Sequence, residues 1–197
     1  MKLILFFNGW GMDESIVSHL DIPSGCTLKT INFPYDIDST LFQQYNEVIP
    51  VGWSFGSYYL AKYLTENNIK CKKVISLNGS PEMIGKNGIS EGVFNLTLDT
   101  LTPDTLLKFY GNMGIDDTFS PSKKNFQDIK EELQYFKDHY VPQKNVFTHA
   151  FIGKRDKIIP VSRQKKYFET NKTAITEIIC GHYPFSAIKS WNILIGE

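Results

Sequence analysis

Runs of apolar residues alternate along this chain with amphipathic stretches of helical period. The run 3–7 is continuously apolar, which is typical of a strand covered on both faces. The same reading predicts further strands and helices, with strands at 28–33, 48–51, 73–78, 145–152 and 175–180 and helices at 14–20, 57–68, 162–169 and 187–195. Strands that alternate with helices predict an α/β fold with a mostly parallel sheet and right-handed crossovers.

Residues 82–144 interrupt this alternation. Glycine-rich turns and two prolines, Pro103 and Pro121, separate amphipathic stretches at 104–110 and 125–140. We interpret the segment as a helical insertion in a single domain. A chain of 197 residues with 42% apolar content can bury one core and little more.

The pentapeptide Gly52-Trp53-Ser54-Phe55-Gly56 has the form of a nucleophile elbow. A predicted strand leads into it and a predicted helix leads out. The serine of such an elbow sits on a tight, strained turn, and flanking glycines let the strand and helix approach closely. The alternative is an ordinary strand-to-helix turn, but the context favours Ser54 as a nucleophile. Pro50 is unexpected in the strand because it cannot donate to a ladder.

A serine hydroxyl needs a base to take its proton, and that base needs a third group to hold its tautomer. Asp156 follows the predicted strand 145–152, and His182 follows the strand 175–180, so both are expected at the carboxyl edge of the sheet. The other histidines fall in predicted helices or inside a strand. Asp156 could instead cap a helix or pair with a neighbouring cation. The order Ser54, Asp156, His182 is that of α/β-hydrolases and predicts a catalytic triad.

A tetrahedral intermediate also needs two backbone donors for its oxygen. The amide of Phe55, directly after the candidate nucleophile, is the expected first donor. The amide of Trp10, in the glycine-rich turn 8–11 after the first strand, is the expected second donor, unless this tryptophan only fills the core. Trp10 and three aromatic residues of the insertion are the candidate walls of a substrate site: Phe109, Phe119 and Phe126.

Charge and cysteine content narrow the range of partners. Twenty-one basic and 21 acidic side chains cancel, so no overall field indicates nucleic acid or a membrane surface as a partner. No apolar run approaches the roughly 18 residues of a membrane span, and the run 3–7 is too short for a signal-peptide core, so a cytoplasmic protein is expected. We also expect a monomer. Cys26, Cys71 and Cys180 are odd in number and far apart, which favours reduced thiols; neither a metal nor a cofactor is expected.

Four pieces of the chain together carry a resemblance to a known family. They are the opening Leu-Phe-Phe-Asn-Gly-Trp-Gly-Met-Asp, the Gly-Trp-Ser-Phe-Gly elbow, the turn Asn78-Gly79-Ser80-Pro81 and the ending Gly181-His182-Tyr183-Pro184-Phe185. The chain resembles the BioG-type pimeloyl-[acyl-carrier protein] methyl ester esterases of biotin synthesis. Its Gly-Trp-Gly and Gly-Trp-Ser pieces are also similar to the longer BioH-type esterase of the same step, which usually has His where this chain has Asn8.

The resemblance implies an α/β-hydrolase fold in which residues 82–144 form a lid. It implies a serine carboxylesterase whose substrate is the methyl ester of pimeloyl-[acyl-carrier protein] and whose partner is that carrier. It also implies that the triad and the two oxyanion donors fall on the residues named above. A thioesterase or broad short-chain esterase remains an alternative, since fold and triad do not fix the acyl group. A non-catalytic binding protein of the same fold is a third reading, and the intact triad candidates count against it.

The charge of the insertion departs from what the BioH-type relative implies. A basic lid would suit an acidic carrier protein, but residues 82–144 contain seven lysines and ten carboxylates, and both arginines of the chain lie outside them. Two other pairs of cations are therefore candidate docking patches, Lys123-Lys124 and Lys154-Arg155.

Overall fold

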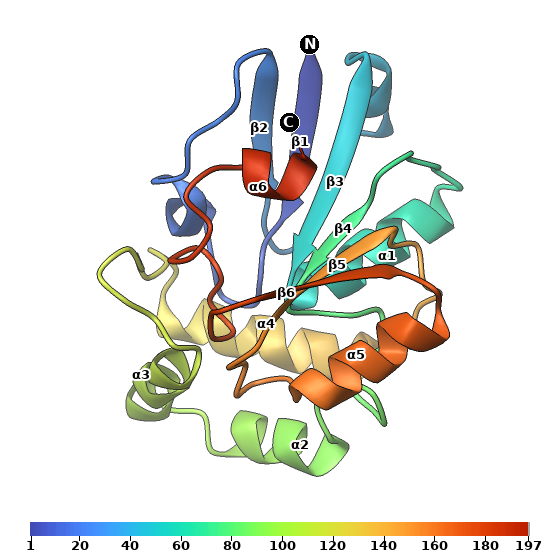
Figure 1. The fold of residues 1–197 in the computed structure, drawn as a ribbon. Coiled ribbons are helices and arrows are strands. Elements are labelled where there is room, and N and C mark those ends of the chain that lie inside the picture. The colour runs from blue at the N-terminus through green and yellow to red at the C-terminus, as the bar shows by residue number, and fades with distance from the viewer. Residues whose placement is uncertain (197) are drawn as a thin grey trace.

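The fold is built on one parallel sheet. The computed structural model describes residues 1–196, with Ser39 described by its backbone alone, and within them a six-stranded sheet has the order β2-β1-β3-β4-β5-β6. All of its pairings are parallel (Figure 1). The strands are β1 (Lys2–Phe7), β2 (Cys26–Ile31), β3 (Glu47–Trp53), β4 (Ile75–Leu77), β5 (His149–Gly153) and β6 (Ala174–Ile178). The predicted α/β class is confirmed.

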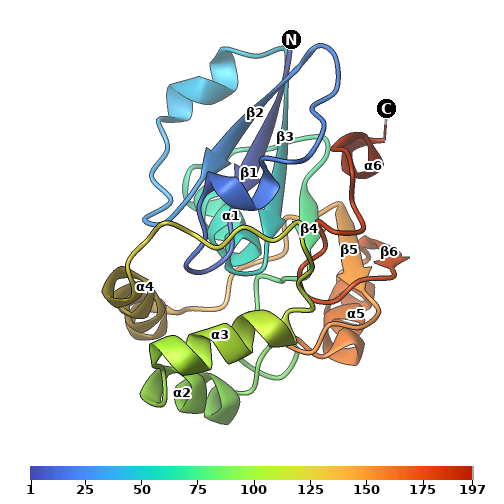
Figure 2. The same ribbon diagram turned by 90° about the vertical axis from the view of Figure 1, so that its left-hand side faces the viewer.

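Helices cover both faces of the sheet and its carboxyl end. They are η1 (Glu14–Val17), η2 (Ser39–Gln43), α1 (Phe55–Glu66), α2 (Glu91–Asp99), α3 (Pro103–Asn112), α4 (Phe126–His139), α5 (Val161–Thr170) and α6 (Asn192–Ile195). Figures 1 and 2 together show α1 and α6 on opposite faces. No helix within residues 1–196 is both long enough and apolar enough to cross a membrane.

The continuously apolar β1 lies between β2 and β3 and is buried on both faces. Successive side chains of a strand point to opposite faces. Phe6 accordingly packs against Phe185 and Trp191 of the C-terminal segment, with ring centroids 5.7 and 5.3 Å away. Phe7 instead packs against Tyr63 of α1 at 6.1 Å. One strand therefore joins the two halves of the core, which explains why its sequence has no polar face.

Several boundaries differ from the sequence-based prediction. The terminal helix predicted at 187–195 is wrong in length: only α6 is helical, because Ser190 forms a bridge with Asp21 and the Trp191 amide donates to the Asp21 carbonyl. The helix α2 had not been predicted. Pro50 lies opposite Leu5 of β1, and β4 pairs with β3 only from Val51 onward. At Pro50, β3 therefore pairs with β1 alone.

The insertion 82–144 contributes α2, α3 and α4, which lie across the carboxyl end of the strands (Figures 1 and 2). Its last helix, α4, is also part of the core. Phe136 of α4 is buried and stacks on Phe55 of α1 at 4.0 Å, with Tyr58 at 5.0 Å. The insertion therefore does not sit on a finished core; α4 completes it.

Replacing Phe136 with alanine should destabilise the fold severely. Removing a fully buried phenylalanine costs about 3–5 kcal/mol through lost burial and the cavity left behind. Leu107→Ala, at a position that is 67% exposed on α3, is the matched control and should change stability by about 0.5 kcal/mol or less. Urea unfolding followed by circular dichroism measures both. Equal midpoints for the two variants would contradict the assignment of α4 to the core.

Candidate active site

Ser54 lies at the sharp turn between β3 and α1. Its backbone has φ 54° and ψ −123°, a conformation that a residue with a side chain rarely adopts. A Cβ on Gly56 would lie 2.0 Å from the Phe7 carbonyl oxygen, and one on Gly52 would lie 2.6 Å from the Cα of Ser57. Both glycines are therefore required by the close approach of α1 to the sheet, as the elbow pattern predicted.

The loops after β5 and β6 bring an acid and a base to this turn. His182 Nε2 lies 2.9 Å from Ser54 Oγ, and His182 Nδ1 lies 2.9 Å from Asp156 Oδ2. All three side chains are buried. The structure thus brings together the three residues that the sequence analysis singled out, in a continuous hydrogen-bonded chain. A carboxylate can only accept, so a hydrogen on Nδ1 would leave Nε2 able to accept the hydrogen bond of the serine hydroxyl.

Asp156 is fixed by donors besides the histidine. Its Oδ1 accepts from the amides of Ile158 and Ile159 at 2.8 and 3.0 Å. Its Oδ2 also accepts from Gln164 Nε2 of α5 at 2.9 Å. These bonds hold the carboxylate in one orientation and compensate for its removal from water. The sequence analysis did not identify Gln164. The signal that could have indicated it is a polar residue on the buried side of the helix 161–170.

Asn78, at the end of β4, ties the loops of the acid and the base together. Its Oδ1 accepts from the Gly153 amide at 2.6 Å, while its Nδ2 donates to the carbonyls of Gly181 and His182 at 2.9 and 3.0 Å. The indole of Trp53 donates to the same His182 carbonyl at 2.9 Å. The histidine backbone is therefore held by side chains from two neighbouring strand ends. Sequence analysis had noted the 78–81 turn without assigning Asn78 this role.

The loop after β1 supplies the other side of the site. Asn8 Oδ1 accepts from the Gly9 amide at 2.9 Å, and Asn8 Nδ2 donates to the Asp13 carbonyl at 2.7 Å. Met12 N donates to the Gly9 carbonyl at 3.3 Å, which closes a tight turn around Trp10. Within the part of the chain that the structure describes, the amides of Trp10 and Phe55 have no hydrogen-bond acceptor. Both amides remain able to bind an oxyanion.

Helix α4 contacts this loop directly. The indole Nε1 of Trp10 donates to the Ile129 carbonyl at 2.7 Å, and the amide of Gly11 donates to Glu132 Oε1 at 3.1 Å. The other oxygen of Glu132 pairs with Lys124 Nζ at 2.9 Å. Burial raises the pKa of the Glu132 carboxyl above its usual range, although the attraction of Lys124 opposes this. Sequence analysis did not select this acid, because a lone glutamate on an amphipathic helix carries no signal.

A cavity of about 190 Å³ opens beside Ser54 and His182. Drug-sized ligands occupy pockets of about 300–1,000 Å³, so this cavity is small by comparison. Trp10 and Phe109, two of the candidate wall residues, line this cavity, and α2 and α4 add Val93, Phe94 and Leu133.

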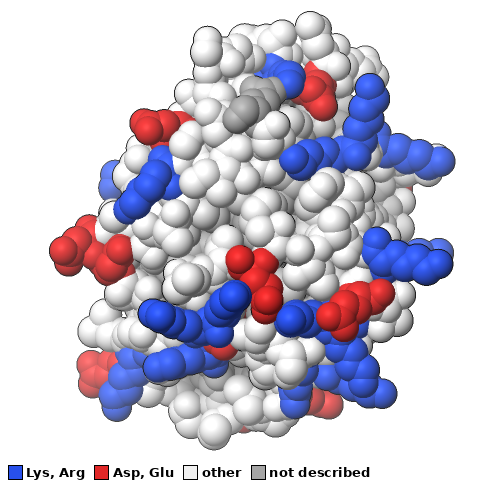
Figure 3. Space-filling view, in the orientation of Figure 1, with Lys and Arg blue, Asp and Glu red and all other residues white. Residues whose placement is uncertain are grey.

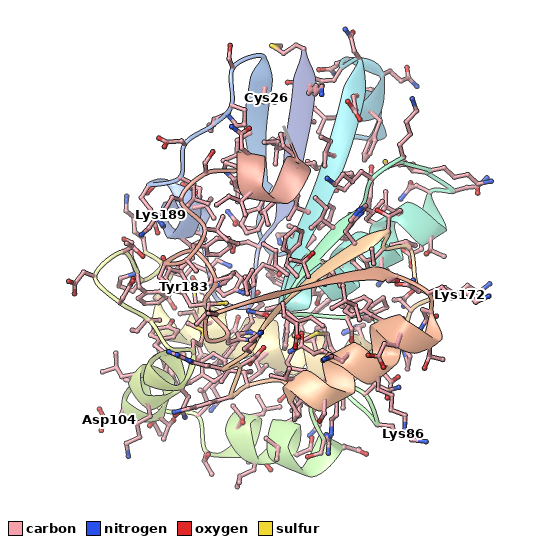
Figure 4. The ribbon with its side chains drawn as sticks, viewed as in Figure 1. Cys26, Lys86, Asp104, Lys172, Tyr183 and Lys189 are labelled. Carbon is pink, nitrogen blue, oxygen red and sulfur yellow. The ribbon has the colours of Figure 1, made fainter. Side chains whose placement is uncertain are left out.

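Two aromatic residues predicted to line the substrate site pack elsewhere. Phe119 contacts Tyr110 and Tyr183, and Phe126 packs against the core. Tyr183, labelled in Figure 4, is fully buried and follows His182 in sequence. Its amide donates to the Met113 carbonyl at 2.9 Å and its hydroxyl lies 3.0 Å from Thr118 Oγ1. Phe119 therefore supports the histidine loop from the insertion and does not form a wall of the cavity.

The surface near the site carries charges of both signs. Figure 3 shows Lys and Arg side chains gathered across the lower half of this face, with acidic side chains between them. Lys154 and Arg155 directly precede Asp156 and are exposed, and Lys157 lines the cavity. In the other candidate patch, Lys123-Lys124, the side chain of Lys124 already forms an ion pair with Glu132. Among the described residues, no group of three or more His, Cys, Asp or Glu side chains could hold a metal ion.

The parallel sheet, the elbow after β3 and the placement of the acid and the base after later strands define the class: this is an α/β-hydrolase fold. The chain matches the family described as "Pimeloyl-ACP methyl esterase BioG" over residues 1–194. It therefore belongs to the BioG family, which supports a hydrolase activity.

Similar proteins include a member of the same family. The crystal structure of BioG from Haemophilus influenzae is similar, with a TM-score of 0.86, 27% identity and coverage of 98% of this chain and 94% of that one. A "Malonyl-[acyl-carrier protein] O-methyltransferase" of Bacteroides fragilis is 32% identical over 201 residues, 95% of this chain but 41% of that protein. The chain thus spans about two fifths of that relative's length. A thioesterase of Streptomyces coelicolor shares the fold, with a TM-score of 0.63, 14% identity and coverage of 99% of this chain and 83% of that one.

Cys180, two residues before His182, should be unreactive in the folded protein. Burial raises the pKa of its thiol to about 11, because the thiolate is poorly solvated there. At pH 8 roughly one Cys180 side chain in a thousand is then a thiolate, and this fraction grows only as pH rises toward the pKa. Iodoacetamide labelling at pH 8, followed by peptide mass mapping, should be much slower in native protein than in urea. Equal labelling rates at Cys180 would be incompatible with its burial.

Proposed function

We propose that this protein is a serine carboxylesterase that hydrolyses the methyl ester of pimeloyl-[acyl-carrier protein] through a Ser54-His182-Asp156 triad. The observation that carries the proposal is the buried chain of 2.9 Å hydrogen bonds from Asp156 through His182 to Ser54, which opens onto an apolar cavity. Membership of the BioG family supports the choice of substrate.

In the first half-reaction Ser54 Oγ attacks the ester carbonyl carbon while His182 Nε2 takes the hydroxyl proton. The carbonyl oxygen becomes an oxyanion, which the amides of Trp10 and Phe55 stabilise. The intermediate collapses when the carbon–OCH₃ bond breaks and the leaving oxygen takes the proton from His182. Methanol leaves, and the pimeloyl chain remains joined to Ser54 as an ester.

In the second half-reaction a water molecule replaces methanol. His182 takes one proton from the water as its oxygen attacks the acyl carbon, and the same two amides stabilise the second oxyanion. Collapse breaks the bond to Ser54 Oγ, which regains its proton from His182. Asp156 stays ionised throughout and stabilises the imidazolium form of the histidine. The product is a free carboxylate, still attached to its carrier at the other end.

The methyl ester itself is supported by two independent observations. The name of the Bacteroides fragilis relative describes a protein that adds a methyl group to a carrier-bound acid, and a methyl ester so formed is what this hydrolase would remove. The cavity beside Ser54 is lined mostly by apolar side chains, and Lys157 is its one lining residue with a permanent charge among the residues described. A neutral methyl ester enters such a site more easily than a carboxylate, which is costly to desolvate.

The products distinguish an esterase from a thioesterase. With pimeloyl-carrier protein methyl ester as substrate, we expect methanol and a carrier whose acyl group has lost one methylene mass, because the distal ester must reach Ser54 through the apolar cavity. Mass spectrometry of the intact carrier measures this. Release of the free carrier thiol would instead assign the protein to the thioesterases.

Two variants serve as controls for this reaction. Ser54→Ala should lower kcat/KM by roughly 10⁴-fold or more, because the remaining groups cannot form the acyl-enzyme. A fluorophosphonate should label Ser54 in the wild type and label it far more slowly in His182→Ala, since only an activated hydroxyl reacts quickly. Undiminished labelling in the histidine variant would refute the triad.

We further propose that the carrier docks on Lys154 and Arg155. These two exposed cations directly precede Asp156 at the carboxyl edge of the sheet, and Lys157 of the same loop lines the cavity. An acidic carrier held there would present its acyl chain at the cavity entrance. The position suits docking better than Lys123-Lys124, where Lys124 is already paired with Glu132.

Reversing these two charges should weaken carrier recognition without affecting the chemistry. Lys154→Glu/Arg155→Glu should raise KM for the carrier-linked ester by roughly threefold to tenfold at low salt, with the difference shrinking as salt screens the attraction. Turnover of a free pimelate methyl ester should not change. Lys172→Glu, at an exposed position that Figure 4 shows at the far edge of the face, is the matched control. Unchanged KM in the double variant would exclude this surface.

A further inference from the structure

Glu132 lies buried in the insertion and is not part of the triad. Packing alone does not explain why a charged side chain occupies this position. It is 1% exposed, yet it carries a carboxylate that must be compensated by specific partners. Of its two oxygens, one accepts from the Gly11 amide and the other pairs with Lys124. We propose that Glu132 is a positioning residue that holds the turn 9–12 in the form that aims the Trp10 amide at the reacting oxygen.

The geometry of the turn supports this role. Met12 N donates to the Gly9 carbonyl, so residues 9–12 form a β-turn with Trp10 and Gly11 at its centre. Gly11 has φ +69°, which a type II turn requires at this position and a type I turn does not allow. The two forms differ by a flip of the central peptide, whose N–H is that of Gly11. A carboxylate that accepts this N–H selects the type II form.

The same helix fixes the turn at a second point. Trp10 Nε1 donates to the Ile129 carbonyl of α4, one turn before Glu132. A Cβ on Gly11 would lie 2.9 Å from Ile129 Cγ2, so α4 packs against the turn with no room between them. With its indole and the next peptide both held by α4, Trp10 has little freedom to rotate its own N–H away from the cavity. The insertion would thus orient the oxyanion donor in addition to lining the site.

The role of Lys124 follows from charge. An unpaired carboxylate beside the turn would repel the developing oxyanion through a medium of low dielectric constant. Lys124 Nζ, 2.9 Å from Glu132 Oε2 and partly exposed, neutralises that charge and leaves the acceptor in place. The Gly11 amide therefore donates to a carboxylate acceptor whose charge Lys124 offsets, so no net negative charge lies next to the oxyanion donors.

A pair of double variants isolates the acceptor. Lys124→Met/Glu132→Gln and Lys124→Met/Glu132→Met are both uncharged at these positions and similar in side-chain shape, but only the first retains an oxygen for the Gly11 amide. On a p-nitrophenyl ester, we expect the Gln variant to stay within about threefold of wild-type kcat, and the Met variant to fall about tenfold to a hundredfold, less than the full loss of one oxyanion donor. KM should change little in either.

A transition-state analogue gives a readout that loss of structure would not mimic. A trifluoromethyl ketone forms a tetrahedral adduct with an oxyanion, so its Ki should rise in the Met variant in proportion to the fall in kcat/KM, and remain near the wild-type value in the Gln variant. Glu131→Gln, at the exposed neighbouring position of α4, is the control and should match wild type. Circular dichroism at the assay temperature verifies that each variant is folded.

The inference rests on the proposed serine hydrolase function, and the two can fail separately. A wild-type protein without Ser54-dependent hydrolysis would remove the proposed function. If wild type hydrolyses the ester and the two folded double variants have equal kcat and equal Ki, Glu132 does not position the turn. A Met variant that loses activity only in proportion to its loss of folded protein would also overturn the inference.

Discussion

The close approach of α1 to the sheet is the constraint on which the candidate site depends. A Cβ on Gly56 would fall 2.0 Å from the Phe7 carbonyl oxygen, so the first turn of α1 can lie against β1 only because this residue has no side chain. Ser54, with φ 54°, stores backbone strain that its surroundings must hold. Ser57 helps to hold it: its hydroxyl donates to the Gly52 carbonyl at 2.7 Å, which joins the helix to the strand across the turn.

Parallel pairing makes the rest of the site possible, because it brings the carboxyl ends of β1, β3, β4, β5 and β6 to one edge. Proximity alone does not align the groups, however. Alignment comes from polar side chains that bond to the backbone of a neighbouring loop, as Asn78 does to the histidine loop and Asn8 does to the turn around Trp10. Such bonds are buried, so breaking one leaves an unsatisfied group and the loops have few alternative positions.

Much of the fold and of the candidate site could be predicted from the sequence, because those features are local. Continuous apolar runs mark buried strands, and the elbow motif requires its glycines within five residues. The positions of Asp156 and His182 follow from strand ends alone. Residues whose roles depend on how side chains pack could not be found this way: Gln164 reaches back from the first turn of α5 to Asp156, and Glu132 reaches Gly11 across 121 positions of sequence.

The balance of charge around the cavity explains how a site with two buried carboxylates could stabilise an anion. Asp156 is surrounded by donors and contacts Ser54 only through His182, so in the proposed mechanism its charge would favour the imidazolium that forms when the serine proton moves. Glu132, on the side of the Trp10 turn, would instead oppose the oxyanion, and Lys124 offsets it within 2.9 Å. The negative charge of Asp156 would thus act on His182, the proposed base, while the side of the proposed oxyanion donors is left close to neutral. In a largely apolar cavity this asymmetry would favour proton transfer to His182 together with negative charge on the carbonyl oxygen, which is the charge distribution that the proposed acyl transfer requires.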